Sequence, residues 1–329
     1  MFKHLFIFSL ILCLPSIAFG ELSNEQAMDI ADKAISSLYD NPPVSVYENI
    51  SDYSTDDIFR DGCINNGEYF YQYTIDRRCY ITEKQKKLSP FNAVVALYET
   101  DVNNPYCTGT IVKDENDGNL YVYTATHCGE SDPNATINIK LQNGQTIEKL
   151  HRVASNLGNI RTDAAIYEIP KKYKLPFVTV GTEGGVYDVI GYGSLPIMSD
   201  EQIANIKQTV AAELDKLGSP LTEASFSFFL SFIMQFVTDP ELKASFGCTL
   251  HEYGQQHTEP STDKTTCQLW TGNSGGPMFN SKTGELVGIA TAAYSRVTSL
   301  DDNNYAEMFH NGYENAAYVQ ETYNNKNEK

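Results

Sequence analysis

The sequence predicts an all-β architecture with an added helical subdomain, and three observations support this. From Phe91 onward, short apolar runs alternate with turn residues, and each run has the length and composition of a strand. The stretch from about Ser199 to Phe246 differs, because its apolar residues recur at helical spacing. We find no internal repeat of the kind that marks repeat architectures. Many short strands with one helical insertion are typical of an all-β domain that carries an extra subdomain.

The expected strands are short and rich in β-branched and aromatic residues. Between two of them, the acidic segment Asp114–Asn119 resembles a calcium-binding loop, but its glycine comes one place early and Ala125 stands where the closing glutamate belongs. We therefore interpret this segment as a hairpin turn. The expected strands are Ala93–Tyr98, Gly109–Val112, Leu120–Tyr123, Thr136–Ile139, Ala164–Tyr167, Val186–Tyr192 and Glu285–Thr291.

The insertion at about 199–246 is expected to form a helical hairpin. A first amphipathic helix ends at Gly218–Pro220, a second runs from about Leu221 to Val237, and a short third one starts at Asp239. The second helix has little polar face, which allows two interpretations: burial inside the protein, or a lid or docking surface beside a substrate cleft. Its apolar run is too short to cross a bilayer, so we expect no stable membrane insertion.

The N-terminus has the three-part layout of a secretory signal peptide. Lys3 precedes an apolar run from Leu5 to Leu14, and small residues end the segment at Ala18 and Gly20. We expect residues 1–20 to be removed and the protein to be secreted, to the extracellular space or a periplasm. Because Lys3 leaves with the signal, the formal net charge of −18 becomes −19. Nucleic acid is excluded as an expected partner by so acidic a balance.

Residues 21–89 are expected to be a separate N-terminal extension, and the composition changes where they end. Ser23 and Gln26 can form a capping box, and helical periodicity then continues to about residue 40. A polar, tyrosine-rich stretch follows and closes with the basic cluster Lys84–Lys87. We interpret this extension as a pro-segment that inhibits the enzyme or assists its folding, and 90–329 as the main domain.

The cysteine content favours disulfides. One of the seven cysteines, Cys13, lies in the signal peptide, and an even number in an exported chain indicates disulfides rather than zinc or free thiols. Six cysteines allow fifteen pairings, and their spacing alone does not select one. The six are Cys63, Cys79, Cys107, Cys128, Cys248 and Cys267.

A glycine-rich segment, Gly272–Pro277, surrounds a candidate nucleophile, Ser274. Glycines on both sides permit a tight turn and allow a substrate to approach closely. The amides of Gly272 and Ser274 could then donate to one carbonyl oxygen and form an oxyanion hole. A serine nucleophile also needs a base and an acid that orients the base. Taken alone, the segment is also compatible with an ordinary glycine-rich turn.

The candidate base and acid are His127 and Asp163. His127 follows an expected strand and stands next to Cys128, where a disulfide would hold it rigidly. Asp163 begins the apolar run Ala164–Tyr167, a position where an aspartate is commonly just a turn residue. No metal site is expected, because His251 begins a zinc-like motif in which Gln255 replaces the second histidine.

These three segments together resemble the chymotrypsin-like, or trypsin-like, serine peptidases. TATHC, TDAAIYEI and GNSGGP occur in the order His, Asp, Ser that is typical of this family, and the similarity extends from about Phe91 to Phe309. The resemblance implies two six-stranded antiparallel β-barrels with the active site between them, and a catalytic triad of His127, Asp163 and Ser274. Within the family, the chain is most similar to the bacterial glutamyl-endopeptidase-like (V8-like) branch.

The resemblance also implies three disulfides. Cys107–Cys128 matches the bridge that ties the histidine loop in trypsins. Cys248–Cys267 matches a bridge before the serine in the bacterial branch. Cys63 and Cys79 are then paired by exclusion. Each bridge is expected to contribute about 2–4 kcal/mol.

The same resemblance identifies the expected specificity pocket, formed by Gln268, Ala290 and Ala293. Gln268 stands where trypsins carry an aspartate, and Ala290 stands where glutamyl endopeptidases carry a histidine. We therefore expect an uncharged residue before the cleaved bond. Asn273 replaces the aspartate with which digestive trypsins bind a new N-terminus, so that ion pair is not expected here.

The sequence therefore predicts a secreted serine endopeptidase that acts on proteins or peptides through an acyl-enzyme, with no metal and no cofactor. Two alternatives remain: a catalytically inactive protease-like binding protein, and an esterase that uses the same triad. The sequence indicates neither the physiological substrate nor the oligomeric state.

Overall fold

The computed structural model describes residues 22–40, 78–129, 134–155, 163–182, 185–234, 237, 239–248, 262–265, 267–295 and 309–327. The chain divides into two compact units, one helical and one built mainly of β-strands. The expected signal peptide, residues 1–20, and Cys63 lie outside the described residues. None of the described helices is both long enough and apolar enough to cross a membrane.

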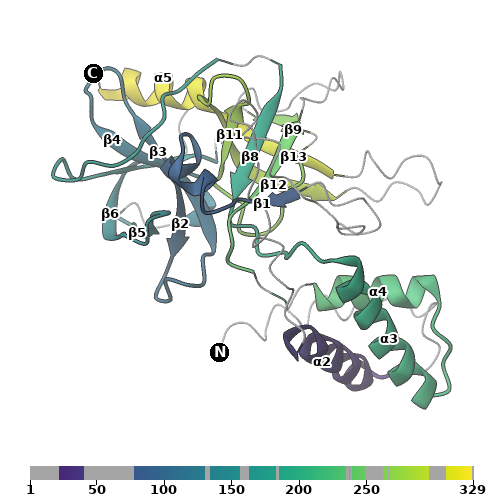
Figure 1. The fold of residues 1–329 in the computed structure, drawn as a ribbon. Helices are drawn as coiled ribbons and strands as arrows, with labels where there is room; N and C mark the ends of the chain where they lie inside the picture. Colours follow the sequence, from purple (N-terminus) through teal and green to yellow (C-terminus); the bar gives the residue numbers. More distant parts are fainter. Residues whose placement is uncertain are drawn as a thin grey trace. The chain divides into compact units, whose positions relative to one another are not determined.

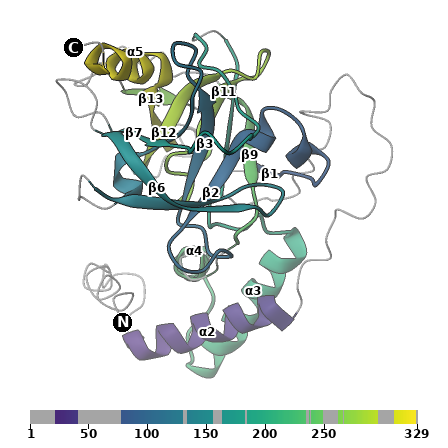
Figure 2. The ribbon, with the colours of Figure 1, turned by 90° about the vertical axis from the view of Figure 1, so that its left-hand side faces the viewer.

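The first half of the β unit is a closed antiparallel barrel, as the family resemblance implies (Figures 1 and 2). Its strand order is β2-β3-β4-β7-β6-β5, so β7 lies between β4 and β6. Side chains such as Val95, Ile111, Val122 and Ile139 are fully buried in its core. The strands are β2 (Val94–Tyr98), β3 (Cys107–Lys113), β4 (Leu120–Thr124), β5 (Thr136–Lys140), β6 (Thr146–Ser155) and β7 (Ala165–Glu168).

The turn between β3 and β4 confirms the hairpin interpretation of the acidic segment. The two strands pair antiparallel, with Lys113 opposite Leu120. The Asp114 carboxylate accepts a hydrogen bond from the Asn116 amide at 2.7 Å, and Gly118 has a φ of +70°, a backbone conformation that favours glycine. This segment therefore closes a strand pair.

The second half of the β unit is a seven-stranded sheet in the order β1-β9-β8-β11-β12-β13-β10. It differs from the expected second barrel of six strands, because an additional strand, β1, pairs with β9. The strands are β1 (Arg78–Tyr80), β8 (Tyr187–Gly191), β9 (Lys243–Cys248), β10 (Thr262–Thr265), β11 (Pro277–Asn280), β12 (Leu286–Ser295) and β13 (Phe309–Asn315).

Strand β1 lies within the range expected to form the N-terminal extension. Its pairing continues beyond the strand, because the Ile81 amide donates to the Leu242 carbonyl at 2.9 Å. The following 3-10 helices η3 (Gln85–Lys87) and η4 (Phe91–Ala93) lead into β2. The pro-segment at 21–89 stays a prediction, but residues 78–89 belong to the β unit in this structure.

A C-terminal helix, α5 (Ala316–Asn327), completes the β unit and is absent from the elements expected from the sequence. Val319 is fully buried, and the Tyr323 ring packs edge-on against Tyr121 of β4 with ring centroids 5.6 Å apart. More than half of its residues are polar or charged, which explains why the sequence shows no apolar periodicity there.

The helical unit contains α2 (Asn24–Asp40), α3 (Asp200–Lys216) and α4 (Glu223–Ile233). The capping box expected at Ser23 forms, since the Ser23 amide donates to the Gln26 side chain and the Gln26 amide to the Ser23 hydroxyl. α2 lies beside α3 in both views (Figures 1 and 2), and Lys33 pairs with Glu213 at 2.8 Å. The helix of the extension and the inserted hairpin, far apart in sequence, thus form one unit.

The apolar face of the insertion is buried inside this helical unit. Its buried side chains include Ile30, Ala34, Ile206, Val210, Phe226, Phe229 and Ile233. Burial accounts for these residues, whereas Phe228, Leu230 and Phe232 of α4 are half-buried. The prediction of a short third helix at Asp239 is wrong. The chain forms a turn there, in which the Asp239 carboxylate accepts a hydrogen bond from the Glu241 amide at 2.9 Å, and it enters β9 at Lys243.

Candidate active site

His127 lies on a short 3-10 turn, η5 (Thr126–Cys128), directly after β4. The turn is fixed by its own backbone, because the Cys128 amide donates to the Ala125 carbonyl at 3.1 Å. The His127 side chain is 48% exposed, so the ring is accessible to a substrate. The turn thus presents an imidazole at the end of a buried strand.

Asp163 faces His127 because of strand register. β7 begins two residues after Asp163 and pairs with β4, where Thr124 lies opposite Ala165. The two carboxylate oxygens then contact the histidine at two points: Oδ2 lies 2.6 Å from His127 Nδ1, and Oδ1 accepts from the His127 amide at 3.1 Å. The hydrogen bond to Asp163 raises the pKa of His127 above its usual value. This carboxylate therefore orients the ring and favours its protonated form.

Ser274 lies on a tight loop whose glycines cannot be replaced without conflict. Gly272 and Gly275 have φ of +98° and +79°. A Cβ on Gly275 would lie 1.9 Å from the Thr124 hydroxyl, and one on Gly272 would lie 2.4 Å from the Tyr192 carbonyl oxygen. The loop needs glycine for both its conformation and its close packing.

Backbone hydrogen bonds attach the Ser274 loop to the neighbouring strand β12. The Gly275 amide donates to the Ala290 carbonyl at 2.6 Å, and the Ala290 amide donates to the Gly276 carbonyl at 2.8 Å. Ala290, one of the expected pocket residues, thus lies directly beside the nucleophile loop. The amides of Gly272 and Ser274 donate to no acceptor among the described residues, whereas the Asn273 amide between them donates to Trp270 at 2.9 Å.

The histidine turn and the serine loop meet at β3. The Thr108 amide donates to the Ser274 carbonyl at 2.8 Å, and the Thr108 hydroxyl donates to the Gly272 carbonyl at 2.7 Å. The same Ser274 oxygen lies 3.5 Å from the sulfur of Cys128, the residue after His127. The structure therefore brings the Ser274 carbonyl into contact with Thr108 of β3 and with the sulfur of Cys128, the residue after the base.

Two disulfides lie beside these elements. Cys107–Cys128 joins the histidine turn to the first residue of β3, and Cys248–Cys267 joins β9 to the segment that precedes the serine loop. Cys79 is disulfide-bonded as well. The side-chain donor atoms of Cys107, His127 and Cys128 lie within 4.8 Å of one another, but the two sulfurs are bonded to each other.

The other expected pocket residues take up different positions. The Gln268 amide donates to the Ser245 hydroxyl of β9 at 3.1 Å. Ala293 lies on β12 opposite Asn311 of β13. Ala293 thus belongs to the sheet itself, whereas Gln268 lies in the segment between β10 and β11 that leads to the serine loop.

Two threonines of this site were not among the expected functional residues. Thr108 is fully buried and contacts Ser274, Gly272 and Tyr192. Thr124 donates its hydroxyl to the Thr108 carbonyl at 2.8 Å. The only sequence signal was their position: Thr108 follows Cys107, and Thr124 lies shortly before Cys128.

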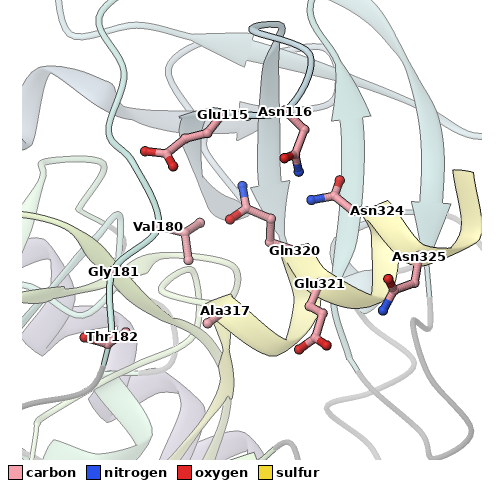
Figure 3. A pocket seen from close by; sticks show the side chains of 10 residues that line it. All are labelled: Glu115, Asn116, Val180, Gly181, Thr182, Ala317, Gln320, Glu321, Asn324 and Asn325. Atoms are coloured by element: carbon pink, nitrogen blue, oxygen red, sulfur yellow. The ribbon is translucent and has the colours of Figure 1, made fainter. Parts of the chain in front are cut away.

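A separate cavity of about 440 Å³ lies away from these residues (Figure 3). One wall is the turn between β3 and β4 and another is α5, and polar side chains predominate. Neither His127, Asp163 nor Ser274 lines it. Its lining includes Glu115, Asn116, Thr182, Gln320, Glu321 and Asn324.

Comparison with known proteins supports the same family. A model of the family described as trypsin-like peptidase domain matches residues 107–289, more than half of the chain. A comparison with curated proteins found no match.

Two solved protease structures are among those similar to this chain. The MamO protease domain from Magnetospirillum magneticum has 17% identity and a TM-score of 0.38, over 69% of this chain and 94% of that one. The inactive form of the Rv3671c protease of M. tuberculosis has 13% identity and a TM-score of 0.38, over 71% of this chain and 88% of that one. Likenesses at this level support no conclusion about activity.

Proposed function

The chain belongs to the trypsin-like peptidase domain family, and from that premise we propose that it is a secreted serine endopeptidase. Its catalytic triad is His127, Asp163 and Ser274. The single observation that carries this proposal is the two-point contact of Asp163 with His127, at 2.6 Å and 3.1 Å, on a turn that contacts the Ser274 backbone through Cys128.

In the proposed mechanism, His127 acts first as a base and then as an acid. Its Nε2 takes the proton from the Ser274 hydroxyl while Oγ attacks the substrate carbonyl carbon. The imidazolium then donates this proton to the leaving amine, and the acyl-enzyme forms. A water molecule, activated by the same ring, hydrolyses the ester. Asp163 holds the ring through Nδ1 and stabilises its positive charge.

The amides of Gly272 and Ser274 form the proposed oxyanion hole. Both amides stand free of acceptors among the described residues, while the Asn273 amide between them is used within the loop. Donors fixed in advance stabilise the charge of the tetrahedral intermediate without reorganisation. The positive φ of Gly272 permits the loop conformation on which this depends.

The proposed substrates are proteins or peptides with an uncharged residue before the cleaved bond. Ala290 beside the loop carries no charge, and the side chain of Gln268 is an uncharged amide. Ala293 is the third proposed pocket residue. Similarity to the V8-like branch stays a prediction. A peptide-library cleavage profile should show small or apolar residues at this position, and one dominated by Arg, Lys or Glu would contradict it.

The proposed pro-segment comprises the N-terminal part of the chain, and we place its end before Arg78. Strand β1 pairs with β9, so a cut at the Lys86–Lys87 cluster would separate a paired strand from its sheet. Lys86 is itself only 13% exposed and pairs with Glu241 at 3.0 Å. N-terminal sequencing of the active secreted enzyme should give a start well after Glu21 and before Arg78, and a start near Glu21 would reject a cleaved pro-segment. A start after Lys87, with no N-terminal fragment co-purifying, would contradict this boundary.

Hydrolysis assays test the proposal directly. The secreted protein should cleave casein, and a Ser274→Ala variant with the same circular dichroism spectrum should not. An inactive binding protein would cleave neither casein nor small esters. An esterase would cleave only the esters. Either result would overturn the proposed function.

A further inference from the structure

Lys243 of β9 carries a buried ammonium group. Only 2% of its side chain is exposed. Its three protons have acceptors at hand: the carbonyls of Gly193 at 2.9 Å, Glu241 at 3.1 Å and Asp239 at 3.2 Å. The Asp239 carboxylate also lies at 3.2 Å. Burial lowers the pKa of Lys243 to about 8. A lysine is rarely buried this completely unless such partners compensate the loss of water.

Arg78 of β1 is a second buried cation close by. It is 2% exposed, and its guanidinium donates to the carbonyls of Leu195 at 2.9 Å and Pro196 at 3.2 Å. β1 is paired with β9, with Tyr80 opposite Lys243. The two cations therefore hold neighbouring carbonyls of one segment, 193–196, from two adjacent strands.

Tyr80 of β1 adds a third contact to this segment. Its hydroxyl accepts from the Ile197 amide at 3.0 Å and bonds the Asp239 carboxylate at 2.5 Å. Its ring faces the Lys243 ammonium at 5.3 Å. Gly193, Leu195, Pro196 and Ile197 are thus all fixed by side chains of β1 and β9. We call residues 193–197 the support segment.

The support segment packs directly against the loop that carries Ser274. The Ser194 amide donates to the Thr271 carbonyl at 2.8 Å. A Cβ on Gly193 would lie 2.2 Å from Oδ1 of Asn273, the residue before Ser274. Asn273 is 5% exposed, and the same Oδ1 accepts from the Trp270 amide at 2.9 Å. A shift of the support segment would therefore displace the serine loop.

We propose that Arg78 and Lys243 are positioning residues for Ser274, acting through the support segment on the loop 270–274. This role rests on the proposed function, and it adds two residues to the groups that support the active site. One of them, Arg78, lies in the range expected to form the N-terminal extension. Neither cation contacts the serine. Each holds carbonyls whose displacement would move the serine and the oxyanion-hole amides relative to His127, whose position is set by β4 and Asp163.

The test compares Lys243→Met and Arg78→Met with the wild type, each expressed as the full chain and assayed in its secreted, processed form. Methionine keeps the aliphatic stem and removes the charge and its hydrogen bonds. Leu150→Ala on β6 is the matched control, because it removes a buried side chain, 2% exposed, from the barrel. Activity is normalised to the folded fraction, measured by circular dichroism well below every melting temperature. kcat and KM are measured with a peptide substrate, and acylation with a fluorophosphonate.

Both methionine variants should lose about 100-fold in kcat and in acylation rate, as expected for a displacement of about 1 Å. KM should change much less, and Leu150→Ala should retain the wild-type kcat. Arg78→Lys should restore part of the loss, because it keeps the charge without the forked donor. A merely structural role would lower the folded fraction and leave kcat per folded molecule unchanged.

Folded methionine variants with the wild-type kcat would overturn the proposal. If Lys243→Met does not fold, the kcat of folded Arg78→Lys is compared with that of the wild type. A lower kcat supports the positioning role, and an unchanged kcat contradicts it. The Ser274→Ala variant, which lacks the proposed nucleophile, gives the background of the labelling assay. A wild-type protein that is itself not labelled would refute the proposed function, which distinguishes that failure from failure of the positioning role.

Discussion

The closed barrel and the seven-stranded sheet each supply part of the proposed triad, but they stabilise it by different means. In the described residues, no charged side chain of the barrel strands β2 to β7 is buried. The sheet, in contrast, buries Arg78, Asp188 and Lys243 on its strands. Strand register and a disulfide fix His127 and Asp163, whereas a polar network surrounds the loop of Ser274.

This difference separates stability from activity. Apolar contacts in the barrel are numerous and individually weak, so the loss of one lowers stability without redirecting the histidine. Hydrogen bonds of buried groups are directional and leave an unsatisfied partner when one is removed. We therefore expect substitutions in the sheet's polar network to change the rate constant more than equally destabilising substitutions in the barrel core.

The largest expected effect is that of Asp163→Asn. The amide retains the shape of the side chain but no longer stabilises the imidazolium or selects the correct tautomer. We expect kcat to fall on the order of 10⁴-fold while the melting temperature changes little. Steady-state kinetics with a peptide substrate measures this. A loss below about tenfold would indicate that Asp163 is not the orienting acid.

Removing each disulfide in turn sharpens the comparison. The sequence separations are 21 for Cys107–Cys128 and 19 for Cys248–Cys267, so each should contribute about 3 kcal/mol to the free energy of unfolding. Double alanine variants, measured by denaturant unfolding, should be equally destabilised. The first should lose more activity per folded molecule, because Cys128 contacts Ser274. Equal losses of kcat would contradict a special role for this bridge.

Two threonines on β3 form a matched pair. Thr108→Val removes a hydroxyl that donates to Gly272 and accepts from Tyr192, and should cost about 1–3 kcal/mol together with part of the activity. Thr110→Val should be neutral or stabilising, because the buried Thr110 hydroxyl has no hydrogen-bond partner among the residues that the structure describes. Thermal melts and kcat of both variants decide this, and equal behaviour would contradict the link between β3 and the serine loop.

The smallest effect concerns pH. The hydrogen bond to Asp163 raises the pKa of His127, so its stabilising effect is complete below the usual value of about 6.5 and is lost as pH rises through the raised pKa. Since the base must be neutral, kcat/KM should rise with pH and reach half its maximum above about 6.5. A pH profile of kcat/KM measures this. A midpoint at or below the usual value would contradict the Asp163 contact.

Much of the barrel, and the three segments that carry the proposed triad, could be identified from the sequence because their signals are local. Val94–Tyr98 has the composition of a strand. In GNSGGP, the glycines that the turn requires are visible in the sequence itself. The disulfide partners came only from the family resemblance, because spacing alone leaves fifteen pairings open.

The remainder depends on contacts distant in sequence. β1 is three residues long and includes Arg78, whose buried guanidinium donates to the distant carbonyls of Leu195 and Pro196. From sequence alone, Lys243 would likewise be assigned to the surface, because lysines are almost never fully buried without partners. The pairing of α2 with α3 joins residues such as Lys33 and Glu213, 180 positions apart, which no local pattern indicates.

The most direct test of the central claim is to locate the adduct of a fluorophosphonate by mass spectrometry in the wild-type protein and in a His127→Ala variant. Activation of one serine by one histidine predicts a single adduct on Ser274 in the wild type and almost none in the variant. A wild-type adduct on another residue, or equal labelling of Ser274 without His127, would contradict it.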